Sequence, residues 1–256
     1  MSITKSFILT FILIIVLFFT NLCNLSDSIF YNLQLDYIYY IKSLVIIITY
    51  IVLILLSDKF SFSKSNFTFI YNNFELIKLI KIFLLFLCLS IFLYSLNLFL
   101  SFFLNFITLD LDMKKYQMII PGDFFLDFFL FPFIAEFFFR KNILRKLHEN
   151  YSSNKSIIIS SLLFSISHVF SDISLLDAFI YGIILGNIFI KFGFLFSFIS
   201  HIIVNLYAAF LLPDFNTFLL KHFEVNILFS SILLLMGFIS LWLSWSFVIT
   251  KSKIQS

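Results

Sequence analysis

The chain has 256 residues, of which 61% are hydrophobic and only 12% charged, and its mean hydropathy is +1.07. A soluble domain carries about twice that charged fraction, so the composition excludes a soluble domain, a disordered tail and a disulfide scaffold. A formal charge of +3 is too small to suggest nucleic-acid binding. The two cysteines, Cys23 and Cys88, match no metal or redox spacing and are predicted to be buried and reduced.

About 20 mainly apolar residues are needed to cross the hydrocarbon of a bilayer. The sequence therefore predicts an all-α polytopic membrane protein with about eight transmembrane helices. Lys5 and the apolar run after it resemble a signal peptide, but residues 20–23 form neither a cleavage site nor a lipid-attachment box, so we expect a retained first helix. The predicted spans are 6–23, 39–56, 79–106, 124–146, 156–170, 175–191, 194–212 and 226–249.

The spans divide the chain into three predicted parts. Residues 1–114 hold the first three helices, residues 115–212 form a core, and residues 213–256 hold a loop and the last helix. With the N-terminus inside, 13 of the 17 Lys and Arg residues fall on the cytoplasmic side and four on the other. This asymmetry predicts that both termini face the cytoplasm, in the plasma (inner) membrane.

Ionisable groups inside spans are costly and are functional candidates by default. Glu136 and Arg140 share one face of the fourth span, and we expect a buried ion pair between them. His168 lies in the fifth span, and His201 and Asn205 share a face of the seventh. At about 1.5 Å per residue, Glu136, His168, His201 and Asn205 lie roughly 10–18 Å deep, which predicts one polar intramembrane cavity.

Such a cluster permits a limited chemistry. A carboxylate and an imidazole can activate water, while a second imidazole and an amide can stabilise an oxyanion. The same groups suit a divalent metal such as zinc, although Asn is an uncommon zinc ligand, so the cofactor stays open.

Three motifs resemble those of the CPBP family, which contains the CAAX proteases and bacteriocin-processing enzymes and is also called the Abi family. Residues 135–140 (AEFFFR) resemble its EExxxR motif, residues 164–168 (FSISH) its FxxxH motif and residues 201–205 (HIIVN) its HxxxN motif. The resemblance covers about residues 115–210. It implies Glu136, His168, His201 and Asn205 as catalytic residues, with Arg140 and Phe164 in support.

The first motif departs from the family at one position. The family has two glutamates, of which the first is usually assigned as the base that activates water, and that position is Ala135 here. Neighbouring helical positions differ by about 100°, so Glu136 does not simply replace it. Asp127 lies two turns away, too remote to substitute without rearrangement.

The first functional hypothesis is therefore an intramembrane endopeptidase, weakened or inactivated by Ala135, that hydrolyses a membrane-embedded or lipidated peptide. In it, Glu136 and His168 activate water, and His201 and Asn205 stabilise the oxyanion. The alternative is a non-catalytic membrane binding or immunity protein of the same fold. A small transporter would be supported by inverted repeats or broken helices, and neither is evident.

Four further features are predicted to be structural. Gly182 and Gly186 form a GxxxG pattern that favours close packing inside the bundle. The basic run 140–146 is expected to anchor the cytoplasmic end of its helix and to touch anionic lipid. His148 and His222 are expected in loops, exposed to solvent.

Overall fold

A computed structural model describes residues 2–25, 35–59, 76–107, 124–169, 174–211, 215, 218–219, 221–222 and 226–249. The part of the chain that it describes is helical and contains no strand. In lipid, backbone N–H and C=O groups have no water to bond, so an apolar chain satisfies them within helices.

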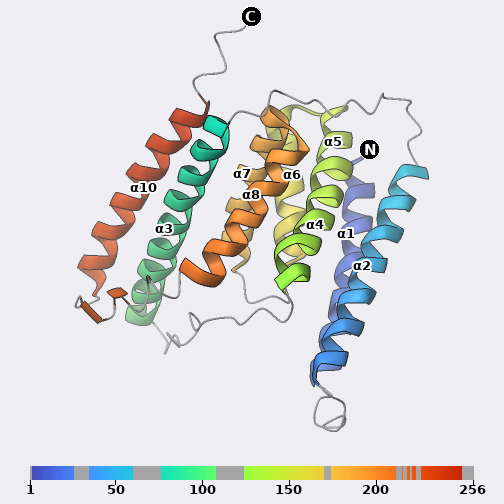
Figure 1. The fold of residues 1–256 in the computed structure, drawn as a ribbon, viewed down its shortest axis with the longest axis horizontal. Helices are drawn as coiled ribbons and strands as arrows, with labels where there is room; N and C mark the ends of the chain where they lie inside the picture. Colours follow the sequence, from blue (N-terminus) through green and yellow to red (C-terminus); the bar gives the residue numbers. More distant parts are fainter. Residues whose placement is uncertain are drawn as a thin grey trace, which may run out of the picture. The chain divides into compact units, whose positions relative to one another are not determined.

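The described residues form two units, which consist of residues 1–72 with 122–201 and of residues 73–121 with 202–256. The three predicted parts are successive segments of the sequence, whereas these two units are groups of residues in contact. The division into three parts therefore stays a prediction. Within the first unit, α1 (Ile3–Leu25) packs against α2 (Leu35–Lys59), and α6 (Ser153–Ile166) packs against α7 (Leu175–Phe192). Within the second, α3 (Leu76–Ile107) and α10 (Ile227–Ile249) run side by side (Figure 1).

The fourth predicted span is one helical run with two wide turns. It contains η3 (Leu126–Leu130), α4 (Phe131–Glu136), η4 (Phe137–Leu144) and α5 (Arg145–His148), where η marks π-helix. Pro132 lies in the first turn of α4, directly after η3, where its missing N–H donor is tolerated. Turns of π-helix are frequent at functional sites, and Glu136 is the residue directly before η4.

Small residues bring helices into close contact in both units. A Cβ on Gly182 would come within 2.9 Å of Ser161 Cβ, and one on Gly186 within 3.2 Å of Ile157 Cγ2, so α7 lies directly against α6. The packing predicted for the GxxxG pattern is confirmed. A Cβ on Gly237 would lie 2.9 Å from Phe92 Cα, which explains how closely α10 approaches α3.

Gly193 reverses the chain between α7 and α8 (Phe194–Leu206), which η5 (Tyr207–Leu211) follows. Its φ is 88°, a backbone conformation that residues with a Cβ atom rarely adopt. Aromatic contacts then hold the start of α8 against α4, because the Phe133 ring lies 5.6 Å from Phe194 and 5.4 Å from Phe198, centroid to centroid.

The chain is an integral membrane protein. Four helices are long and apolar enough to cross a bilayer, and three of the other described helices are apolar but shorter. The four are Leu79–Leu100, Leu175–Phe192, Phe194–Leu211 and Ile227–Ser246, and the shorter ones are Ile3–Phe19, Tyr40–Leu56 and Ser153–Ile166.

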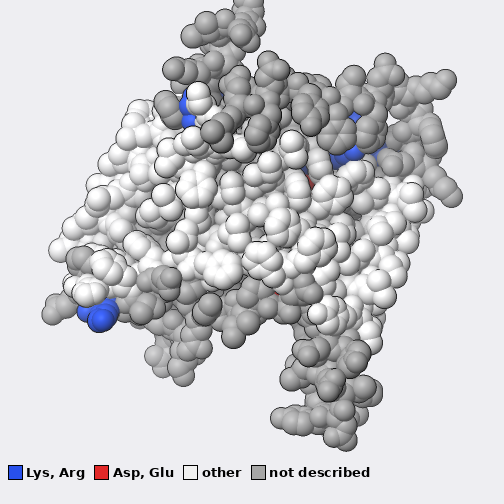
Figure 2. All heavy atoms as spheres, viewed as in Figure 1, with Lys and Arg blue, Asp and Glu red and all other residues white. Residues whose placement is uncertain are grey.

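The outer faces of the helices are suited to lipid. Large apolar side chains such as Phe11, Ile41 and Leu228 are exposed by 62%, 62% and 68%. Over the first unit, Figure 2 shows the charged atoms gathered near the end of α5, with an uncharged surface over the middle of the helices. Exposed apolar area of this extent is found where a protein meets a membrane or a partner.

Several sequence predictions are refined by the structure. Cys88 is a half-buried free thiol, whereas the Cys23 side chain lies outside the described residues. His148 and His222 are exposed as predicted, but both are helical rather than part of a loop, and His148 is the last residue of α5. Some basic residues counted for orientation also lie outside the described part, namely Lys64, Lys114, Lys115, Lys251 and Lys253.

Candidate active site

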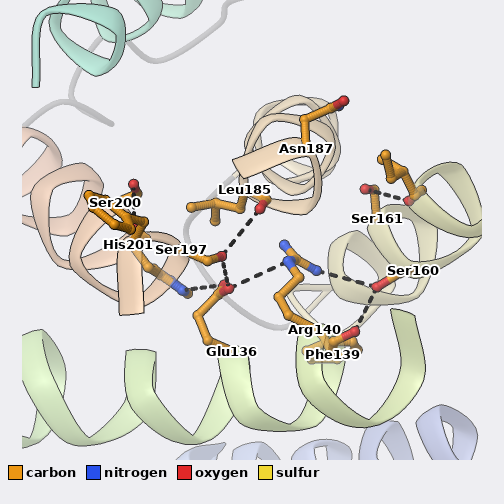
Figure 3. Close-up of polar contacts among 12 residues, drawn as sticks. Glu136, Phe139, Arg140, Ser160, Ser161, Leu185, Asn187, Ser197, Ser200 and His201 are labelled. Carbon is orange, nitrogen blue, oxygen red and sulfur yellow. Dashed lines mark hydrogen bonds and ion pairs between the residues drawn. The ribbon is translucent and has the colours of Figure 1, made fainter. Parts of the chain in front are cut away.

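Glu136 is the centre of a buried polar network that joins three helices. It is the last residue of α4 and its side chain has no exposed surface. One carboxylate oxygen, Oε1, lies 3.1 Å from Nδ1 of His201 in α8. The other, Oε2, accepts a hydrogen bond from the Ser197 hydroxyl, also in α8, and lies 3.5 Å from Nε of Arg140 in η4 (Figure 3).

Arg140 is fully buried beside this carboxylate. The ion pair predicted from the i, i+4 spacing is present, although its 3.5 Å separation is longer than a hydrogen bond. The guanidinium lies 4.8 Å from the centre of the Phe164 ring, and Nη1 lies 3.4 Å from Ser160 Oγ. Ser160 in turn donates to the Phe139 carbonyl, at 2.9 Å, so α6 is tied to the helix that carries Glu136 and Arg140 (Figure 3).

His168 was predicted to lie within a helix, but it lies in the turn that follows α6. The expected fifth span was 156–170, whereas α6 runs from Ser153 to Ile166. The His168 N–H bonds to the Ser165 carbonyl, three residues back, at 2.9 Å, which tightens the chain at this point. The Nδ1 atom of His168 is 2.8 Å from the carbonyl oxygen of Phe164, and a carbonyl can only accept, so Nδ1 carries the proton.

Phe164 links the two histidines. Its ring centroid lies 4.5 Å from that of His168 and 5.7 Å from that of His201. Both imidazoles therefore contact the same aromatic ring. Phe164 also contacts Arg140, so its ring touches three of the predicted site residues.

The roles of the other predicted features stay predictions. Asn205 lies one turn beyond His201 in α8, and its catalytic role is one of them. The shared polar cavity also stays a prediction. Within the described part of the chain, no three His, Cys, Asp or Glu side chains group so that they could hold a metal ion.

Ala135, the departing position, is 9% exposed and belongs to the apolar core of the first unit. Its cluster includes Phe138, Phe139 and Phe164. The methyl group at this position is therefore buried in an apolar cluster that also contains Phe164 of the site.

Two serines of the network were missed from the sequence. Ser197 and Ser160 are both buried, and each hydroxyl bonds a residue of the α4–η4 run. Serine is common throughout this chain and is usually satisfied by its own helix, as Ser200 is by the Phe196 carbonyl at 2.6 Å. The one available signal was spacing, because Ser197 precedes His201 by four residues and shares its helical face.

Residues 118–207 match the family described as type II CAAX prenyl endopeptidase Rce1-like. This match contains all three motifs and confirms the resemblance to the CPBP family over this segment. No curated protein and no solved structure matches the chain.

Proposed function

We propose that the chain is an intramembrane endopeptidase that hydrolyses a peptide bond in a membrane-embedded or lipidated peptide. The match of residues 118–207 to the prenyl endopeptidase family supports this class of reaction. The observation that carries it is the buried contact of Glu136 with His201, 3.1 Å from Oε1 to Nδ1, within that segment. A carboxylate that orients an imidazole is a recurring arrangement for activating a nucleophile, here water.

His168 is the second imidazole of the proposed site. Its Nδ1 proton is bonded to a backbone carbonyl, so in the neutral ring Nε2 holds the lone pair and can accept a proton or bind water. The sequence hypothesis pairs Glu136 with His168 for water activation and assigns the oxyanion to His201 and Asn205.

A binding or immunity protein of the same fold is the second candidate function. It is favoured by Ala135, which removes the carboxylate usually assigned as base in the family. It is also favoured by the engagement of both Glu136 oxygens with protein groups, which suits a structural ion pair.

The test of the proposal is cleavage by the full chain in lipid vesicles. Slow release of the C-terminal fragment from a prenylated peptide is expected, with His168→Ala as the blank. The matched control is His148→Ala, which removes an exposed histidine outside the network and should cleave at the unmodified rate. Peptide binding without cleavage, in every variant, would contradict the peptidase and support the binding protein.

We also propose eight membrane spans with both termini in the cytoplasm, on the basis of the 13-to-4 distribution of Lys and Arg. Reporters of sidedness fused after residue 256 and inserted within residues 213–226 are expected on opposite sides of the plasma membrane. Reporters on the same side would contradict the proposed orientation or number of spans.

A further inference from the structure

The contact with Glu136 determines which nitrogen of His201 is available for chemistry. An ionised carboxylate can only accept, so the Nδ1 atom 3.1 Å away must carry the proton. In the neutral imidazole the lone pair is then on Nε2. An Nε2 atom with a lone pair can take a proton, but it cannot donate a hydrogen bond to an oxyanion.

Burial separates the roles of Glu136 and His201. The Glu136 side chain is 0% exposed, and its oxygens face His201, Ser197 and Arg140. The His201 side chain is 9% exposed. A carboxylate enclosed by three protein groups does not contact a substrate or its water, whereas the imidazole at the edge of the network can.

The two imidazoles differ in the partner of Nδ1. For His201 the partner is a carboxylate, and for His168 it is a neutral backbone carbonyl. A carboxylate that holds an imidazole by its Nδ1–H is the arrangement of the Ser-His-Asp triad, in which the imidazole is the general base.

We propose that His201 is the general base, acting through Nε2, and that Glu136 and Ser197 are the residues that position it. This inference rests on the proposed peptidase function and deepens it. It gives the chain a base despite Ala135, from α8 rather than from the helix of the first motif.

Hydrolysis of the peptide bond through His201 takes two steps, each with one proton transfer. Water gives a proton to His201 Nε2 while its oxygen bonds to the scissile carbonyl carbon, which forms a tetrahedral oxyanion and an imidazolium. The oxyanion then collapses, the C–N bond breaks, and the imidazolium returns the proton to the leaving amine. Glu136 stays ionised throughout and keeps its bond to Nδ1–H.

Ser197 fixes the carboxylate for this task. Its hydroxyl donates to Glu136 Oε2 and lies 3.2 Å from the Leu185 carbonyl of α7, so it sits where α4, α7 and α8 meet (Figure 3). Ser200 offers a matched control, because it is equally buried on the same helix but bonds its own helix at Phe196.

The first experiment reads the histidine tautomer and needs no activity. The chain contains four histidines, so nitrogen NMR of the histidine-labelled full chain in lipid nanodiscs can assign His201 by comparison with His201→Gln. The expected signal is a neutral ring protonated at Nδ1 and bare at Nε2, retained in Ser200→Ala. A ring protonated at Nε2 would overturn the proposal, even if the chain proves to be a peptidase.

The second experiment measures cleavage in lipid vesicles. Ser197→Ala is expected to lower kcat about 10–100-fold, by analogy with the partners that orient metal-bound imidazoles, with little change in KM and with Ser200→Ala unchanged. Equal rates for the two serine variants would overturn the positioning role. If the tautomer is as expected but nothing is cleaved, the proposed function fails and the geometry stands.

Glu136→Gln distinguishes a positioning carboxylate from a base. In Glu136→Gln the amide oxygen can still accept a hydrogen bond from the Nδ1–H of His201, so cleavage should persist at a reduced kcat. If Glu136 were itself the base, cleavage would fall to the level of the His168→Ala blank, which would overturn the assignment of His201.

Discussion

Ala135→Glu is expected to raise peptide cleavage above that of the unmodified chain, but by less than the roughly 10²–10⁴-fold that a general base contributes where none is present, because His201 already serves as one. The reason is chemical, since this position carries the water-activating carboxylate in the family that the motifs resemble. The unmodified chain would cleave weakly, through His201 alone. The measurement is the single-turnover rate on a prenylated peptide in lipid vesicles, with both proteins at equal concentration.

The control for this gain is Ala135→Gln, which adds the same volume without a charge. Ala135 is packed in an apolar cluster, so either long side chain will strain the core, and thermal stability must be measured for both variants. Equal rates for Gln and Glu would show that shape rather than charge is responsible. Fast cleavage by the unmodified chain would contradict the prediction that Ala135 weakens activity.

Arg140→Leu is expected to lower the free energy of unfolding by about 3–5 kcal/mol, because it leaves the Glu136 carboxylate buried without its charge partner. Both side chains are 0% exposed, so neither can turn to solvent to relieve the loss. The measurement is chemical unfolding of the purified protein in detergent micelles, followed by tryptophan fluorescence, since the chain has two tryptophans.

Lys155→Leu is the matched control for charge removal. Lys155 is an exposed cation that also lies over an aromatic ring, 4.9 Å from the centre of Tyr151, but it has no buried carboxylate to strand. Its loss should cost about 0.5 kcal/mol or less. Glu136→Gln combined with Arg140→Leu should recover part of the loss, because no charge is then left unpaired. An unchanged stability for Arg140→Leu would contradict the buried ion pair.

The same pair of experiments separates the two candidate functions. In a binding or immunity protein, Arg140→Leu would destabilise the chain, but Ala135→Glu would add no cleavage. In the peptidase, the two effects are independent, because Arg140 acts through the fold and Ala135 through the reaction. A chain that is destabilised by the first change and cleaves no peptide, with or without the second, is therefore a binder.

The sequence by itself determined the features that depend on neighbours along the chain. Apolar runs of sufficient length predicted helices and a membrane protein, because lipid leaves no other way to satisfy the backbone. The i, i+4 spacing of Glu136 and Arg140 predicted their ion pair, since both are carried by one helical run. The order of three motifs predicted the resemblance to the family, which the match of residues 118–207 confirms over that segment.

The tertiary structure alone decided which groups meet across helices. Ser197 bonds Glu136, His201 presents Nδ1 to the same carboxylate, and Phe164 contacts both imidazoles. These contacts depend on how each helix is rotated about its axis. In a soluble protein an apolar stripe reveals that rotation, but helices that are apolar on every side carry no such stripe. Packing between small residues sets the rotation instead, as at Gly182 and Ser161, and it is visible only when the helices are assembled.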